Sequence, residues 1–278
     1  MISLYTGTPG SGKSLHCAKT ILRWLFMYKS NIISVNLKLN REECYKDKKK
    51  YRRRFLDFKW YKNRNNKRYF QTPRSRRGVI YNIMDFDKLS PEVFYKYAAR
   101  HHIKGKEHQT LIVIDEAQMV FDDKLMKEKD QYFKELLNQK KTKNYISSDN
   151  EIKKAHAYEQ GYRKSWDEFF SHHRHLGYDI IIITQFDKLI SPRVRAQVEY
   201  NYVHRKVNNY SFGFVLSLFG ISIFLCKTWW YQTKMSTGTQ FFGYNKRFAK
   251  IYDSYKLFDE ILARYHSSKA SRVIEISE

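Results

Sequence analysis

Short apolar runs separated by polar turns divide this chain into candidate strands and helices. Five runs have the length and composition of strands: residues 2–6, 31–37, 79–83, 111–114 and 180–183. The last two, LIVI and IIII, are continuous β-branched runs typical of strands buried on both faces of a parallel sheet. Residues 15–27 and 91–101 instead place apolar side chains at helical spacing. This alternation predicts an α/β fold with a mainly parallel sheet covered by helices on both faces.

The last third of the chain has a different pattern. Residues 212–226 (FGFVLSLFGISIFLC) carry no charge but include two glycines and two serines. A membrane-spanning helix needs about 20 apolar residues, so this run is short for one. Two interpretations stay open: a buried strand or core segment followed by an aromatic strand over 228–233, or insertion into a membrane. We expect one domain over residues 1–200 and a small β-rich extension over 201–278 that ends in a helix over 252–265.

The composition points to an anionic partner and a reducing compartment. Lysine and arginine number 52 against 28 acidic residues, a net charge of +24. Such an excess favours nucleic acid, nucleotide phosphates or an anionic membrane surface as partners. The three cysteines are widely spaced with no CxxC, which indicates neither a disulfide framework nor a zinc site. The N-terminal sequence lacks the basic and apolar regions of a secretory signal, so we expect a cytosolic protein.

Half of the excess charge lies in one segment. Residues 41–77 contain 16 basic and 4 acidic positions, and aromatic side chains alternate with the basic ones. That combination offers phosphate contacts beside planar faces on which unpaired bases can stack, which favours single-stranded DNA as the partner. An anionic lipid surface is the alternative partner. A solvated charged helix or hairpin without a partner is the third interpretation.

A complete phosphate-binding motif follows the first predicted strand. Gly7-Thr8-Pro9-Gly10-Ser11-Gly12-Lys13-Ser14 matches GxxxxGK[ST] and leads through Leu15 into a predicted helix. Glycines allow backbone N–H groups to surround the phosphates, and the helix N-terminus adds positive potential. Lys13 is expected to reach the β- and γ-phosphates of ATP, and the Ser14 hydroxyl to bind Mg²⁺. The sequence therefore predicts a P-loop NTPase.

Two other strand ends supply candidates for the chemistry. Asp115 and Glu116 directly follow the run 111–114, at the sheet edge where open α/β folds bind ligands. Asp115 is expected to hold Mg²⁺ through water and Glu116 to orient or deprotonate the attacking water, which favours hydrolysis over transfer. Gln185 follows the run 180–183 and is a candidate for sensing the γ-phosphate. A glutamine that bonds only its own loop is the alternative.

The segment SHHRH at residues 171–175 precedes the strand at 180–183. Adjacent histidines on a helix point in different directions and no fourth ligand is evident, so we do not predict a metal site there.

Taken in order, these motifs resemble the zonular occludens toxin (Zot) family. The resemblance rests on the N-terminal Walker A motif, LIVIDEAQ, HRHLGYDIIIITQ and a late IYDSY, and it covers about residues 1–260. It implies an ATPase related to ring-forming DNA motors that acts in filamentous phage assembly and export at the bacterial inner membrane. By this resemblance Lys13 and Ser14 are the phosphate and Mg²⁺ residues, Asp115 and Glu116 the Walker B pair, and Gln185 the sensor.

The resemblance also implies partners and a place in the cell. We expect a homo-oligomeric ring that acts on single-stranded DNA or a phage DNA–protein complex. Arg174 is the candidate for completing a neighbouring subunit's site, with Arg163, Arg193 and Arg195 as rivals. We expect the protein in the host cytoplasm, at the inner membrane through residues 212–226 or 41–77. A packaging or transfer motor unconnected with virion export is the alternative function, and a secreted toxin is disfavoured by the ATPase motifs.

Overall fold

The computed structural model describes residues 1–45, 78–86, 89–141, 158–210 and 221–252. In these parts the chain forms an eight-stranded sheet in the order β3-β2-β4-β5-β1-β6-β7-β8. The strands are β1 (Ile2–Thr6), β2 (Asn31–Val35), β3 (Ile80–Ile83), β4 (Thr110–Ile114), β5 (Tyr178–Ile183), β6 (Tyr200–Lys206), β7 (Ile223–Trp230) and β8 (Met235–Gly243). Strands β1 to β6 run parallel to one another, and β7 and β8 are antiparallel additions.

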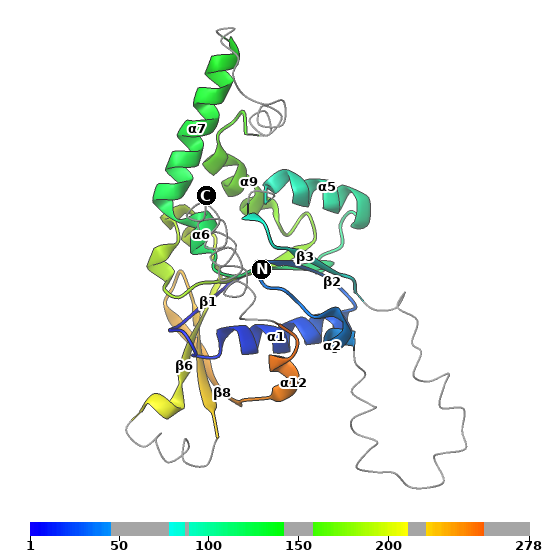
Figure 1. Ribbon diagram of the computed structural model, residues 1–278, viewed down its shortest axis with the longest axis vertical. Coiled ribbons are helices and arrows are strands. Elements are labelled where there is room, and N and C mark those ends of the chain that lie inside the picture. Colours follow the sequence, from blue (N-terminus) through cyan, green and yellow to red (C-terminus); the bar gives the residue numbers. More distant parts are fainter. Residues whose placement is uncertain (46–77, 87–88, 142–157, 211–220, 253–278) are drawn as a thin grey trace, which may run out of the picture.

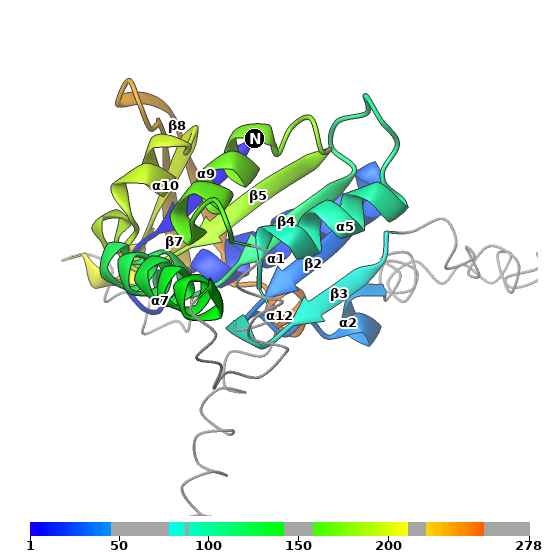
Figure 2. The same cartoon turned by 90° about the horizontal axis from the view of Figure 1, so that it is seen from above.

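Helices cover both faces of this sheet (Figures 1 and 2). One face carries α5 (Pro91–His101), α6 (Gln118–Phe121), α7 (Asp123–Lys141), α9 (Tyr162–His172) and α10 (Pro192–Ala196). The other face carries α1 (Lys13–Arg23), its π-helical continuation η1 (Trp24–Tyr28), α2 (Arg41–Tyr45) and α12 (Lys246–Ala249). Two single-turn 3₁₀ segments complete the described elements: η5 (Asp187–Leu189) lies between β5 and α10, and η6 (Val207–Asn209) follows β6. The predicted α/β fold with a mainly parallel sheet is confirmed.

The continuous apolar runs account for the centre of the sheet. Every residue of β4 and β5 is buried, since helices lie above and below them. Alternate residues of these strands face the two cores: Ile112 and Ile180 contribute to the core beneath α5 and α9, whereas Leu111 and Ile181 contribute to the core beneath α1. This two-sided burial explains why neither strand shows a polar face in the sequence.

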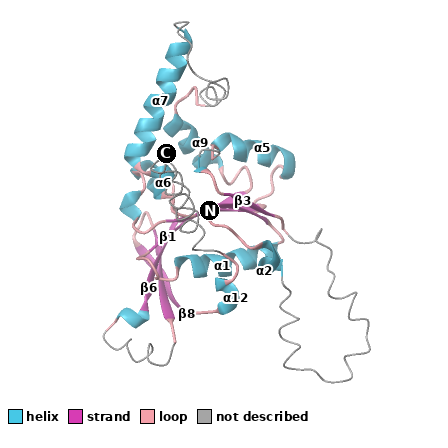
Figure 3. Ribbon diagram, viewed as in Figure 1, coloured by secondary structure: helices cyan, strands magenta, loops and turns pink. Residues whose placement is uncertain are grey.

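The strands after residue 200 continue the same sheet. Strand β6 pairs in parallel with β1, and β7 and β8 extend the sheet as an antiparallel ribbon (Figure 3). Residues 223–226, the end of the uncharged run, belong to β7, so the aromatic strand expected over 228–233 in fact begins at Ile223 and ends at Trp230. From Phe224 the strand pairs with both β6 and β8, and burial alternates along it, since successive side chains of a strand point to opposite faces.

Several sequence predictions fall outside the described residues. These are the basic segment from residue 46 to 77, residues 212–220 of the uncharged run, and the closing helix after residue 252. Within the described ranges, none of the helices combines the length and the apolar character that crossing a bilayer requires.

Candidate nucleotide site at the carboxyl edge of the sheet

The predicted phosphate-binding loop connects β1 to α1 at the carboxyl edge of the parallel strands. Gly7, Gly10 and Gly12 have φ values of 144°, 73° and 91°, which L side chains rarely adopt. Space is restricted as well: a Cβ on Gly7 would lie 2.4 Å from the carbonyl oxygen of His204, and one on Gly12 would lie 2.8 Å from the ring of Phe224. The loop is therefore shaped by its own glycines and by contact with β6 and β7.

The lysine of the motif lies over this loop. Lys13 Nζ donates hydrogen bonds to the carbonyl oxygens of Gly7, at 2.6 Å, and Thr8, at 3.1 Å. Burial lowers the pKa of Lys13, while the charges of Asp115 and Glu116 oppose that change. The ammonium group is thus held at the loop by acceptors that anionic phosphate oxygens can replace.

The loop also contains a buried polar atom without a partner. The Ser11 hydroxyl is buried and finds no hydrogen-bond partner in the part of the chain that the structure describes. Thr8, Pro9 and Gly10 are exposed, whereas Leu15 is buried and anchors α1 in the core. An exposed loop tip on an anchored helix leaves room for an anion above the helix N-terminus.

The two predicted carboxylates follow β4 at the same edge. The backbone N–H of Asp115 donates to the carbonyl oxygen of Val35 at 3.0 Å, and Asp115 Oδ1 accepts from the backbone N–H of Glu116 at 3.0 Å. Burial, aided by the charge of Glu116, raises the pKa of Asp115 to about 6. Glu116 has a φ of 49°, an uncommon conformation for a residue with a side chain. An uncommon backbone conformation and a partly buried carboxylate pair thus occur together at the two residues that the sequence assigns to chemistry.

Hydrogen bonds between side chains also connect the segments that follow β4 and β5, and the sequence alone did not predict them. The Thr184 hydroxyl donates to Gln118 Oε1 at 2.9 Å, and Gln118 Nε2 donates to the carboxylate of Glu116. Gln118 thereby fixes Glu116 and is itself fixed by the residue that follows β5. The sequence signal was the glutamine in DEAQ, but only the pairing of β4 with β5 shows what it contacts.

Gln185 lies between the loop and the carboxylate pair. Strand β5 is inserted between β1 and β4, and the Gln185 carbonyl oxygen accepts a hydrogen bond from the backbone N–H of Gly7 at 3.1 Å. The residue predicted to sense the γ-phosphate is therefore positioned directly beside the phosphate-binding loop.

A pocket of about 530 Å³ adjoins the loop on the β6 side. Its lining includes Thr8, Gln185, Arg205, Lys206 and Tyr210. Nothing in the local sequence around Arg205 and Lys206 connects these two residues to the phosphate-binding motif. Because β6 pairs with β1, these two cations lie near the loop of their own chain and are additional candidates for contact with an anionic ligand.

Arg174 lies at the opposite, amino edge of the sheet. It follows α9 and precedes β5, and its guanidinium donates to a carboxylate oxygen of Glu199 at 2.5 Å, just before β6. Its side chain is 53% exposed. Arg174 is thus remote from the loop of its own chain and is accessible to a second molecule.

The donors at the carboxyl edge fit a magnesium nucleotide. Ser14, in the first turn of α1, offers a hydroxyl oxygen, and Asp115 offers a carboxylate, the hard oxygen ligands that Mg²⁺ prefers. The unpartnered Ser11 hydroxyl and the backbone N–H groups of the loop suit phosphate oxygens. Lys13, Asp115, Glu116 and Gln185, which are separate in sequence, are brought to one edge by the order of the strands.

Comparison with solved structures finds matches at low sequence identity. The N-terminal domain of zonular occludens toxin from Neisseria meningitidis is 16% identical, with a TM-score of 0.45 over 91% of this chain and 98% of that one. B204, the DNA-packaging ATPase of Sulfolobus Turreted Icosahedral Virus, is 15% identical, with a TM-score of 0.43 over 86% and 95%. A DnaB-like replicative helicase is 12% identical, with a TM-score of 0.49 over 89% and 56%.

No curated protein matches the chain. A protein-family model does: the one described as zonular occludens toxin (Zot) matches residues 1–256 of the 278. The resemblance seen in the order of the motifs is thereby confirmed, and the chain belongs to the zonular occludens toxin (Zot) family.

Proposed function

We propose that this chain binds ATP with Mg²⁺ and hydrolyses it. The observation that carries the proposal is the convergence of the phosphate-binding loop, Lys13, the Asp115–Glu116 pair and Gln185 at one sheet edge. The raised pKa of Asp115 and the unpartnered hydroxyl of Ser11 support it, because both mark polar groups that a bound cation or phosphate would satisfy.

In this proposal each residue has a separate role. The loop N–H groups and Lys13 hold the β- and γ-phosphates, and their charge stabilises the transition state. Ser14 and Asp115 hold Mg²⁺, which when bound neutralises phosphate charge. Glu116 accepts a proton from the attacking water, and Gln118 keeps its carboxylate oriented. Gln185 is close enough to the loop to contact the γ-phosphate or the water.

The energy of hydrolysis, we further propose, drives a motor for virion assembly and export at the host inner membrane. Membership of the Zot family and the net charge of +24 support this proposal. A homo-oligomeric ring fits the position of Arg174, which is 53% exposed at the edge opposite the loop. Single-stranded DNA or a phage DNA–protein complex is the proposed substrate, because either carries the negative charge that a basic protein attracts.

A DNA-translocating or packaging motor that does not export virions is the second candidate, and the net charge of +24 favours it equally. Producing phage that encode a Glu116→Gln variant separates the two. Loss of virion release with normal intracellular DNA, together with inner-membrane co-fractionation of the protein, supports export. Loss of DNA packaging or transfer, with the protein absent from the membrane fraction, supports the alternative.

The enzymatic proposal is tested by the same substitution in purified protein. Glu116→Gln keeps the shape of the side chain and an acceptor for Gln118 but removes the base. We expect ATP affinity close to that of the parent and a turnover that falls by about 10²–10⁴-fold. Hydrolysis of ATP at the parent rate by Glu116→Gln would show that Glu116 does not activate the water.

A further inference from the structure

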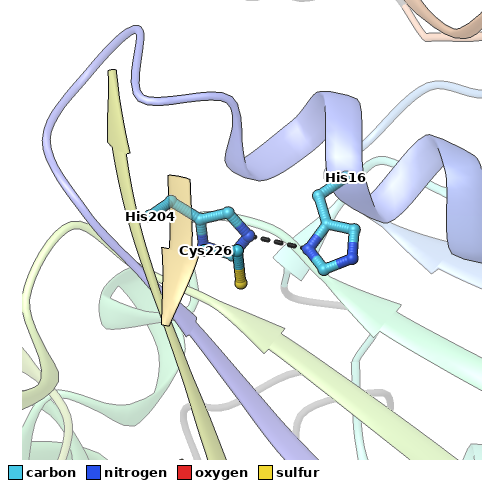
Figure 4. A group of neighbouring side chains, drawn as sticks. All are labelled: His16, His204 and Cys226. Atoms are coloured by element: carbon cyan, nitrogen blue, oxygen red, sulfur yellow. Dashed lines mark hydrogen bonds between the residues drawn. The ribbon is translucent and has the colours of Figure 1, made fainter. Parts of the chain in front are cut away.

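Two buried imidazoles and a buried thiol, side chains of types that bind metals, lie together near the first turns of α1, which follows the phosphate-binding loop. His16 comes from α1, His204 from β6 and Cys226 from β7 (Figure 4). One ligand atom from each residue lies within 4.8 Å of the other two, and the three side chains are buried. In the part of the chain that the structure describes, these three side chains form a group whose ligand atoms are close enough together to bind one metal ion.

The ligand atoms are already close to a coordination geometry. His16 Nδ1 and His204 Nε2 are 2.8 Å apart and share a hydrogen bond. Zinc binds imidazole nitrogen at about 2.0–2.1 Å and thiolate sulfur at about 2.3 Å, so tetrahedral ligands lie about 3.3–3.7 Å from one another. Movements of about 1 Å or less therefore convert the observed group into a coordinating one.

A second, independent feature is the environment of His204. Its other ring nitrogen, Nδ1, lies 3.2 Å from the carbonyl oxygen of Thr6. Donation of the Nδ1–H to that carbonyl leaves Nε2 with a free lone pair directed at His16. Metal-binding histidines almost always make such a second hydrogen bond to a carbonyl or carboxylate. Thr6 ends β1, so the contact also ties His204 to the start of the phosphate-binding loop.

We propose that His16, His204 and Cys226 form a zinc site that links α1 to strands β6 and β7. Two imidazoles and one thiolate are the mixed nitrogen and sulfur ligands that Zn²⁺ accepts. A water molecule is the proposed fourth ligand. Of the three protein ligands, His16 lines a pocket of about 410 Å³, together with Tyr5 and Tyr202. The site is separate from the proposed Mg²⁺ ligands Ser14 and Asp115 and does not depend on ATP hydrolysis.

Binding exchanges one proton for the metal ion. The Cys226 S–H bond breaks, the sulfur keeps the electron pair and bonds to Zn²⁺, and the proton leaves to solvent. Zinc also replaces the hydrogen bond between His16 and His204, and the ring proton of His16 moves to its Nε2. Because α1 begins at Lys13, the ion would fix the base of the phosphate-binding loop against the antiparallel part of the sheet.

The test uses the intact chain, freed of metal with a chelator and then titrated with Zn²⁺ or Co²⁺. We expect about one zinc per chain by elemental mass spectrometry after dialysis, a higher unfolding temperature with zinc, and a near-ultraviolet charge-transfer band from thiolate to Co²⁺. Cys226→Ser should abolish the band and weaken zinc binding by at least about tenfold.

Two variants control for other sites. Cys44→Ser removes a cysteine that is equally buried but lies in α2 outside the group, and His172→Ala/His175→Ala removes exposed histidines; both should retain zinc and the cobalt band. Absence of the thiolate band in the parent protein, or zinc retention by folded Cys226→Ser equal to that of the parent, would overturn the proposal. The parent spectrum decides the question even if Cys226→Ser fails to fold.

Discussion

Charged side chains lie at both edges of the parallel sheet, but the contacts that they make differ between the two edges. At the amino edge the polar groups are paired: Arg174 forms an ion pair with Glu199 at 2.5 Å, and His108 shares a hydrogen bond with Asp179 at 2.6 Å. At the carboxyl edge Asp115 and Glu116 are adjacent like charges, and burial raises the pKa of Asp115 to about 6. The same sheet thus has paired groups at one edge and, at the other edge, two adjacent carboxylates beside the phosphate-binding loop.

The paired groups at the amino edge need no ligand, whereas the polar groups at the carboxyl edge lack some of the contacts that a ligand would provide. The Arg174–Glu199 pair is partly exposed, and such a pair contributes about 0–1 kcal/mol and needs no further partner. Two half-buried carboxylates, a strained φ at Glu116 and an unpartnered Ser11 hydroxyl cost stability unless a ligand compensates them. The carboxyl edge is where a magnesium nucleotide would supply that compensation.

The largest expected effect concerns Arg174 and would give the amino edge a role in catalysis. We predict that Arg174→Ala lowers ATP turnover by about 10³-fold while sparing ATP affinity, because an arginine donated to a neighbour stabilises transition-state charge. Arg193 is the matched comparison: it is 54% exposed and paired with Asp167 at 3.0 Å. Arg193→Ala should stay near the parent rate.

Mixing subunits tests whether Arg174 acts across an interface. Arg174→Ala chains retain their own loop, and Lys13→Ala chains retain Arg174, so a mixed ring should regain part of the activity that each lacks alone. If the mixed subunits assemble but ATP turnover does not recover, Arg174 does not act across the interface and its role is structural. Loss of activity in Arg193→Ala instead would move the assignment to Arg193.

An intermediate effect should follow from the connection between β5 and Glu116. Gln118→Ala removes the amide that donates to the Glu116 carboxylate, and hydrogen bonds to charged groups are worth about 1.5–3 kcal/mol. We expect turnover to fall about 10–100-fold with little change in ATP affinity. Thr184→Val should give a smaller decrease, because it acts only through Gln118. Steady-state kinetics measures both, and a Thr184→Val defect larger than that of Gln118→Ala would contradict this order.

The smallest expected effect is a dependence on pH. With a pKa of about 6, Asp115 gains a proton as pH falls through 6 and loses the negative charge that Mg²⁺ needs. We predict that kcat/KM for ATP decreases about tenfold for each pH unit below about 6, since kcat/KM reports the free enzyme. Circular dichroism at each pH checks that the fold persists. A flat profile between about pH 5 and pH 7 would contradict the assigned role of Asp115.

The sequence was most informative where function or burial imposes a local pattern. The motif at residues 7–14, the strands LIVI and IIII and the helix over 91–101 were predicted in place, because each depends on neighbouring residues. The role of Gln118 and the meeting of His16 with His204 were not predictable in this way. These contacts depend on β5 lying between β1 and β4, and on β6 pairing with β1 from the far end of the chain. The order of strands in a sheet cannot be deduced from the local periodicity of apolar residues.

The central claim is that the carboxyl edge binds a nucleotide through Lys13. The most direct test measures the affinity of Mg²⁺–ATP for Lys13→Ala and for Lys19→Ala by isothermal titration calorimetry. Lys19 is an exposed lysine on the same helix, outside the loop. We predict an affinity about 10²-fold weaker for Lys13→Ala, since a charge-assisted contact to phosphate is lost, and an unchanged affinity for Lys19→Ala. Equal affinity in both variants, with the fold retained, would contradict the account.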